Sequence, residues 1–105
     1  MLTITDLCKA GLTSYRGIRW WEERGLLGKV DKSAKSWKIT EEHLRRVKII
    51  SAAQYCSFSL EEIASLIDNY DIEAHEALQV KLSGVAHTAL SLSTSLPEPL
   101  QVFDL

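Results

Sequence analysis

The chain has 105 residues, of which 46% are hydrophobic and 25% are charged, as expected for one globular domain with a modest core. No apolar run approaches the roughly 20 residues that cross a bilayer, and the first residues lack the basic and apolar regions of an export signal. We therefore expect a cytoplasmic protein with no membrane partner. The two cysteines, Cys8 and Cys56, lack the spacing of a disulfide framework or a metal site, and we expect two small buried apolar residues.

Charge is divided unevenly along the chain. Residues 1–50 hold eleven of the twelve Lys and Arg against six acids, a net charge of +5, whereas residues 51–105 hold one lysine against eight acids, a net charge of −7. A basic half joined to an acidic half indicates a polyanionic partner at one end only.

A short helix is predicted near the N-terminus, over residues 5–10. Thr5 is expected to cap it, because a threonine oxygen can accept from the free N–H groups of the first turn. Gly11 is expected to end it, with Leu12 as a buried linker residue.

A second helix follows within about three residues, which completes a helix-turn-helix pattern. Thr13 or Ser14 caps this helix, which runs to about residue 24. Gly25 then stands where a left-handed stop costs least.

The second helix has two unlike faces. Ile18 and Trp21 lie on an apolar face that should pack inward, and Gly17 lies close to the other face, where it would let a partner approach. That other face carries Tyr15, Arg16, Arg19, Trp20 and Glu23. Guanidinium groups suit phosphate oxygens and guanine edges, since they donate paired hydrogen bonds. The alternative is that both arginines pair with the neighbouring acids, Glu22 and Glu23.

The middle of the chain predicts a β-hairpin and two further helices. Residues 26–39 have apolar ends around a lysine-rich tip, which is typical of a hairpin. Thr40 caps a third helix over residues 41–55, and Ser59 with Glu62 forms a capping box for a short fourth helix.

The last predicted helix covers residues 72–95 and is followed by two prolines. Its apolar residues alternate steps of four and three, the stripe of a coiled coil, which predicts dimerisation. The alternative is that the helix folds back on its own domain. The stripe comprises Leu78, Leu82, Val85, Ala89, Leu92 and Leu96.

Two segments resemble the MerR family of transcription regulators. The segment ITDLCKAGLTSYRGIRWWEERGLL is similar to the family's N-terminal signature, with Arg16 and Arg19 at its two arginines and the two tryptophans at its two tyrosines. The segment TEEHLRRVKIISAAQYCSFSLEEI is similar to the next part of the family pattern. The resemblance covers about residues 4–68.

The resemblance implies a mainly α fold, a winged helix-turn-helix whose second helix enters the major groove. It implies that residues 1–70 form the DNA-binding domain, 71–96 the dimerisation helix and 97–105 a tail. At the two tyrosine positions, Trp20 is expected to contact the DNA backbone and Trp21 to pack inside. The expected DNA-binding residues are Ser14, Tyr15, Arg16, Arg19, Trp20, Lys32, Lys35 and Lys38.

The predicted wing departs from the family. Members usually carry Gly-Tyr-Arg-x-Tyr before the third helix, whereas this chain has Lys-Ser-Trp-Lys-Ile over residues 35–39. We therefore expect the wing to contact DNA through its lysines as a diffuse positive tip, a contact that positions the protein more than it reads sequence. The alternative is an ordinary solvated loop.

The resemblance further implies a bacterial, nucleoid-associated homodimer that binds an inverted repeat in double-stranded DNA and bends or untwists a promoter. RNA polymerase or a recombinase is a further candidate partner. No effector domain, cofactor or metal is expected, because nothing after Pro97 resembles a sensor, and His43, His75 and His87 are too scattered for a metal site.

Two other classes of function remain open. One is an excisionase-like architectural factor of a mobile element. The other is a MerR-like modulator that binds a protein and not DNA. An enzyme is not expected, because the chain has no nucleophile–histidine–acid set and no glycine-rich phosphate loop.

Overall fold

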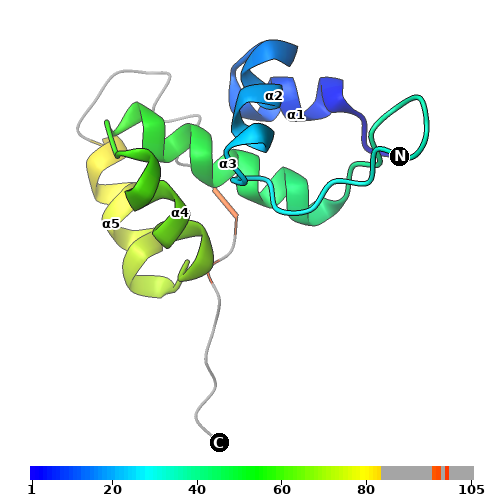
Figure 1. Cartoon of the computed structure of the whole chain (residues 1–105). Helices are drawn as coiled ribbons and strands as arrows, with labels where there is room; N and C mark the ends of the chain where they lie inside the picture. Colours follow the sequence, from blue (N-terminus) through cyan, green and yellow to red (C-terminus); the bar gives the residue numbers. More distant parts are fainter. Residues whose placement is uncertain (84–95, 98, 100–105) are drawn as a thin grey trace, which may run out of the picture.

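The computed structural model describes residues 1–83, 96, 97 and 99. Five helices lie in this part of the chain: α1 (Ile4–Gly11), α2 (Tyr15–Glu23), α3 (Glu41–Tyr55), α4 (Leu60–Asp68) and α5 (Ile72–Ser83). Helix α3 crosses the molecule, with α1 and α2 at one end and α4 and α5 at the other (Figure 1). The mainly helical fold expected from the sequence is thus confirmed.

Three of the predicted helix caps are present. The Ser14 hydroxyl oxygen accepts from the backbone N–H of Gly17 at 3.3 Å, which starts α2. Ser59 and Glu62 exchange two hydrogen bonds, of 3.0 and 3.1 Å, which starts α4. Thr40 precedes α3 as expected, and Gly25 has the left-handed φ of 79° that ends the second helix.

The first helix ends at Gly11 as predicted, but its predicted start and its predicted linker residue are wrong. The helix is preceded by Thr3, not Thr5, and the Thr3 backbone N–H donates to the Asp6 carboxylate at 2.7 Å. The left-handed residue is Leu12, with φ 51° and 58% of its surface exposed, so it is not a buried linker. Gly11 is buried instead.

Gly11 serves the packing of α1 against the rest of the core. A Cβ atom there would lie 2.9 Å from both Trp21 Cζ3 and Val47 Cγ1, closer than carbon atoms approach. The Gly11 carbonyl also accepts from the buried Ser51 hydroxyl at 3.1 Å. Glycine therefore lets α1 approach α2 and α3, which sets the position of the helix-turn-helix.

The core joins all five helices. Each of its larger aliphatic side chains contributes about 1.5–3 kcal/mol by leaving water. Its fully buried large side chains are Leu7, Ile18, Leu27, Val47, Ile49, Ile50, Ile63, Tyr70, Leu78 and Leu82. The two cysteines are only partly buried, contrary to expectation, and burial raises the pKa of the Cys56 thiol.

The segment over residues 26–39 forms no strand in the described chain. A single antiparallel bridge joins Asp31 to Lys38, whose backbone N–H donates to the Asp31 carbonyl at 3.0 Å. Between them, the Asp31 carboxylate accepts from the Ser33 N–H at 2.9 Å, a local bond that favours a turn over a ladder. We call residues 29–39 the wing; it runs as a loop (Figure 1), and this one bridge closes it.

The first part of the predicted dimerisation stripe lies inside the chain's own core. Leu78 and Leu82 are fully buried, and α5 packs against α3. Leu96 is partly buried against the same core. The stripe's remaining residues, Val85, Ala89 and Leu92, lie outside the described residues, so their dimerisation role stays a prediction.

Candidate nucleic-acid interface

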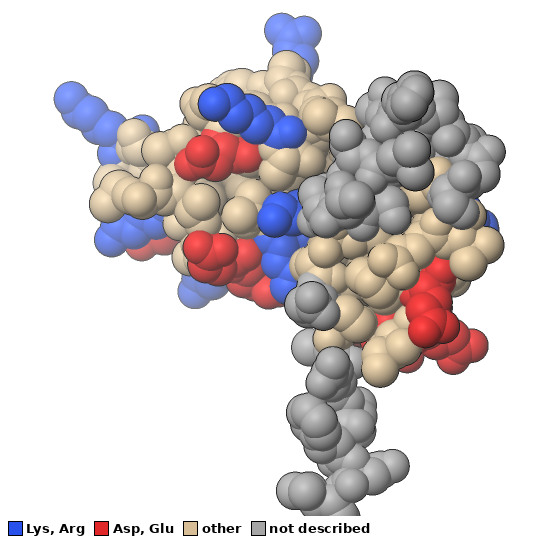
Figure 2. All heavy atoms as spheres, turned by 180° about the vertical axis from the view of Figure 1, so that it is seen from behind, with Lys and Arg blue, Asp and Glu red and all other residues tan. Residues whose placement is uncertain are grey.

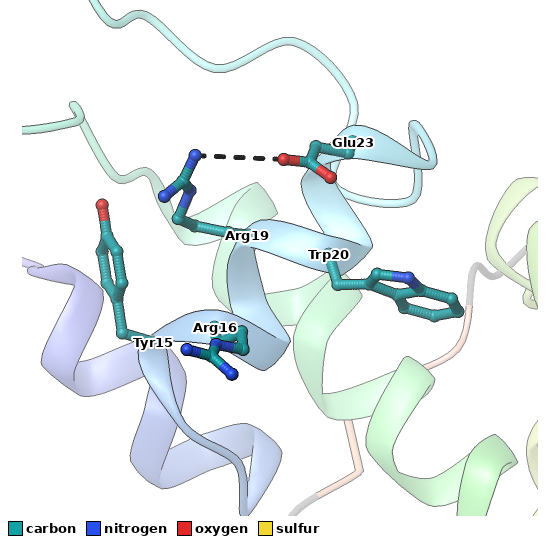
Figure 3. Close-up of a pocket in the computed structure, with 5 residues that line it drawn as sticks. All are labelled: Tyr15, Arg16, Arg19, Trp20 and Glu23. Carbon is teal, nitrogen blue, oxygen red and sulfur yellow. Dashed lines mark ion pairs between the residues drawn. The ribbon is translucent and has the colours of Figure 1, made fainter.

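Helix α2 presents one face to solvent and anchors the other. Ile18 and Trp21 are 0% and 4% exposed and hold the helix to the core, whereas Tyr15 is 50% and Trp20 is 37% exposed. The outward face forms a shallow depression of about 380 Å³. Figure 3 shows the five residues that line it: Tyr15, Arg16, Arg19, Trp20 and Glu23.

Both arginines of this face are available to a partner. The Arg19 guanidinium lies 4.0 Å from the Glu23 carboxylate, with side chains 55% and 58% exposed (Figure 3), and such a long, solvated pair is weak. Among the described residues Arg16 forms no ion pair. Glu22, the other acid that could have neutralised them, pairs with Lys32.

The aromatic side chains flank the arginines. Tyr15 and Trp20 project from the two ends of the face, with the arginines between them (Figure 3). The Arg19 guanidinium lies 5.9 Å from the Tyr15 ring centre, and the Arg24 guanidinium lies 4.5 Å from that of Trp20. These cation–π contacts order the charges without neutralising them.

Gly17 does not leave an open approach to this face. A Cβ atom at Gly17 would lie 2.0 Å from the Thr13 hydroxyl oxygen, so the Thr13 side chain occupies that space. Gly17 is the third residue of α2 and lies in its first turn, beside the Ser14 cap. Its small size therefore serves the turn between α1 and α2.

The wing lysines differ in how they are held. Lys32 pairs with Glu22, and its ammonium lies 5.0 Å from the Trp37 ring centre. Lys38 lies 3.8 Å from the Asp31 carboxylate, but its side chain is 67% exposed. Lys35 is exposed and lines a groove of about 360 Å³ between the wing and the first residues of the chain.

Local hydrogen bonds keep Asp31 charged at the bridge of the wing. The Ser33 hydroxyl donates to this carboxylate, as does the Ser33 backbone N–H, and together they lower its pKa below the usual 3.8. The nearby Lys38 lowers it further. The wing therefore carries one fixed negative charge among its lysines.

The base of the wing is attached to α3 through a buried histidine. His43 Nδ1 accepts from the Thr40 backbone N–H at 3.0 Å, and its Nε2 donates to the Lys29 carbonyl at 2.9 Å. The Arg46 guanidinium donates to the Leu26 carbonyl at 3.4 Å. His43 thus has a structural part here, and the described residues contain no cluster of three metal-ligating side chains.

Sequence reasoning missed the contact between the wing and α2. The ring centres of Tyr15 and Trp37 lie 6.3 Å apart with the planes tilted by 42°, and Glu22 reaches Lys32 beside them. The only sequence signal was a tryptophan in a loop otherwise rich in lysine and serine.

Lys and Arg are unevenly distributed over the folded surface. Figure 2 shows most of them over the end formed by α1, α2 and the wing, where acids also lie among them, whereas acids predominate at the far end, over α4 and α5. None of the described helices is long and apolar enough to cross a bilayer. The α2 face therefore lies at the basic end of the molecule.

The match to known families agrees with this geometry. Residues 2–70 match the family model described as MerR HTH family regulatory protein, and this region includes α1 to α4 and the wing. The chain belongs to the MerR family. The resemblance seen in the two sequence segments is therefore confirmed.

Curated relatives of this MerR-family chain are regulatory proteins. It is 30% identical over 82 residues to the HTH-type transcriptional regulator CueR of Escherichia coli O6:H1, covering 76% of this chain and 60% of the relative. It is 39% identical over 67 residues to the mercuric resistance operon regulatory protein of Shigella flexneri, covering 63% of this chain and 46% of that relative. The chain thus spans about half the length of these relatives, and no solved structure matches it.

Proposed function

We propose that this MerR-family protein binds double-stranded DNA sequence-specifically and as a dimer, and regulates transcription from a promoter that it bends or untwists. The observation that supports this most directly is the exposed α2 face, on which Arg16 and Arg19 are not neutralised by the neighbouring acids. The family match and the regulators among the relatives support the same function.

The α2 face carries groups that could bind both the base edges and the phosphate backbone of a DNA duplex. Arg16 and Arg19 would donate to guanine edges or phosphates in the major groove, each with paired hydrogen bonds. The Tyr15 hydroxyl and the Trp20 indole N–H would reach phosphates, which fix the register. The Ser14 hydroxyl, already accepting from α2, still has a proton to donate to a phosphate.

The wing would add sequence-independent contacts to the backbone. Lys35 and Lys38 are exposed and extend the positive surface beyond α2. Lys32 would act mainly through its pair with Glu22. The acidic end, over α4 and α5, would face away from the duplex because phosphates repel it.

Dimerisation would set two such surfaces on an inverted repeat. The remainder of the predicted apolar stripe, after α5, is the proposed contact between copies, and it would raise affinity by linking two half-sites. RNA polymerase or a recombinase would meet the complex on the DNA.

The experiment is a fluorescence-anisotropy titration of the purified chain against random and selected duplexes at rising salt. With about four phosphate contacts per protomer, a dimer should show log affinity falling with log salt at a slope of about −7. Selection of bound sequences from a random pool should return an inverted repeat. No binding at low salt would overturn the proposal and favour the modulator that binds a protein.

A further inference from the structure

The wing has little backbone structure to hold it in place. One bridge closes it, between Asp31 and Lys38, and the His43 side chain of α3 attaches its first residue, Lys29. Residues 31–36 are all exposed. The direction of the wing relative to α2 must therefore come from side chains.

Trp37 supplies the first of these contacts. Its indole is partly buried against the core and lies 6.3 Å from the Tyr15 ring, within the range of favourable aromatic pairs. On the wing side, the Lys32 ammonium lies 5.0 Å from the Trp37 ring centre. The indole thus touches α2 and organises a wing lysine at once.

Lys32 supplies the second contact, through its pair with Glu22. Only 14% of the Glu22 side chain is exposed, so the carboxylate that pairs with Lys32 is largely withdrawn from solvent. Tyr15 opens α2 and Glu22 lies two turns later, which places the two attachment points about 10 Å apart along the helix. One contact would act as a hinge, whereas two separated contacts fix an orientation.

We infer that Trp37 is a positioning residue for DNA binding: with Lys32, Tyr15 and Glu22 it locks the wing onto α2, so that wing lysines and α2 arginines meet the duplex at a set separation. The inference rests on the proposed DNA binding. Trp37 acts through Lys35 and Lys38 and does not itself contact DNA. The locked wing spares the loop the entropy of ordering on binding.

A double-mutant cycle tests this assignment. The variants are Trp37→Ala, the pair Lys35→Ala with Lys38→Ala, all three together, and Trp37→Phe, each measured by anisotropy over a range of salt. Trp37→Ala should weaken binding about five- to tenfold in the wild-type background, because the loop must then be ordered at each encounter. It should change affinity less than twofold once the lysines are gone.

The salt dependence and the conservative variant separate positioning from general stability. Trp37→Ala should flatten the salt slope as removal of the lysines does, whereas Trp37→Phe, which keeps a ring against Tyr15, should restore most of the affinity. A merely structural residue would weaken binding equally in both backgrounds and leave the slope unchanged.

Each outcome decides between named alternatives. If Trp37→Ala proves unfolded by circular dichroism, Lys32→Met replaces it in the cycle, since it breaks the other attachment from an exposed position. Additive effects, or wild-type affinity and slope in the variant, would overturn the inference while leaving DNA binding intact. Failure of the wild-type chain to bind any duplex would overturn the proposed function and this inference with it.

Discussion

Glu22 of α2 forms its ion pair with Lys32 of the wing and not with either arginine on the outward face of its own helix. Its neighbour Glu23 lies on that face, at 4.0 Å from Arg19. Adjacent glutamates on α2 therefore have different parts: one attaches the wing, and the other borders the surface proposed to meet DNA.

Affinity for DNA should respond differently when each of the two glutamates is replaced by glutamine. Glu23→Gln removes a negative charge facing phosphates and releases Arg19, so affinity should rise about two- to fivefold at low salt. Glu22→Gln removes the same charge but detaches Lys32, so affinity should not rise. Anisotropy titrations of both variants measure this. An equal gain in the two would mean that the Glu22 pair is irrelevant to binding.

Alanine should lower the free energy of unfolding at both Gly11 and Gly25, but for different reasons. Gly11→Ala places a methyl group against Trp21 and Val47 and should lower the free energy of unfolding by about 1–3 kcal/mol. Gly25→Ala meets no atom within 4 Å but forces a side chain to φ 79°, at about 1–2 kcal/mol. Urea unfolding of each variant gives these values.

Val47 provides the control for this pair. In a Val47→Ala background Gly11→Ala should lose part of its effect, because one of the two clashing groups has been removed and Trp21 remains, whereas the effect of Gly25→Ala should not change. Equal additivity for both glycines would show that Gly11 does not serve the packing of α1.

Leu78 and Leu82 should contribute to the stability of the single chain and not to the contact between two copies. Both are fully buried within one chain, so Leu78→Ala should lower the free energy of unfolding by about 2–5 kcal/mol. Truncation after Tyr70 would remove both and should unfold the domain. A Leu78→Ala variant of unchanged stability that sediments as a monomer would show instead that this leucine faces a second copy.

The dimer itself is better tested farther along the stripe. A Val85→Ser, Leu92→Ser variant should keep the far-ultraviolet circular dichroism of the wild type at high protein concentration but sediment as a monomer. Its affinity for an inverted repeat should fall to that for a single half-site. A wild-type chain that is monomeric at every concentration would contradict the dimer proposal.

Acid should weaken the start of α4. The Ser59 backbone N–H, with its hydroxyl, lowers the pKa of Glu62 below the usual 4.5. The stabilisation is therefore complete above the usual value and is lost as pH falls through the lowered one. Glu62→Gln, which cannot titrate, should lose less stability than the wild type between neutral pH and about pH 3. Urea unfolding at both pH values measures the difference.

Local signals in the sequence located most helix ends. Ser14, Thr40 and the Ser59–Glu62 pair act within three residues of themselves, so their caps could be predicted without knowing the fold. The same pattern joins Thr3 to Asp6, and it was a signal for the true start of α1. The periodicity of α2 likewise separated its inward and outward faces correctly.

Features that depend on distant residues could not be predicted in this way. Gly11 is required because of Trp21 and Val47, which lie on other helices. Trp37 of the wing is placed by its contact with Tyr15 of α2. An apolar stripe such as that of α5 has the same spacing whether it packs on α3 or on a second copy, so periodicity alone could not choose between them.

Arg16 and Arg19 of α2 are the residues proposed to bind DNA. The most direct test compares the wild-type chain with Arg16→Ala and Arg19→Ala in anisotropy titrations against a selected duplex, with Lys81→Ala as a control that removes one positive charge from the acidic half. Each arginine variant should keep the wild-type unfolding curve and lose about ten- to hundredfold in affinity, about 1–3 kcal/mol. Lys81→Ala should bind like the wild type. Wild-type affinity in both arginine variants would contradict the account.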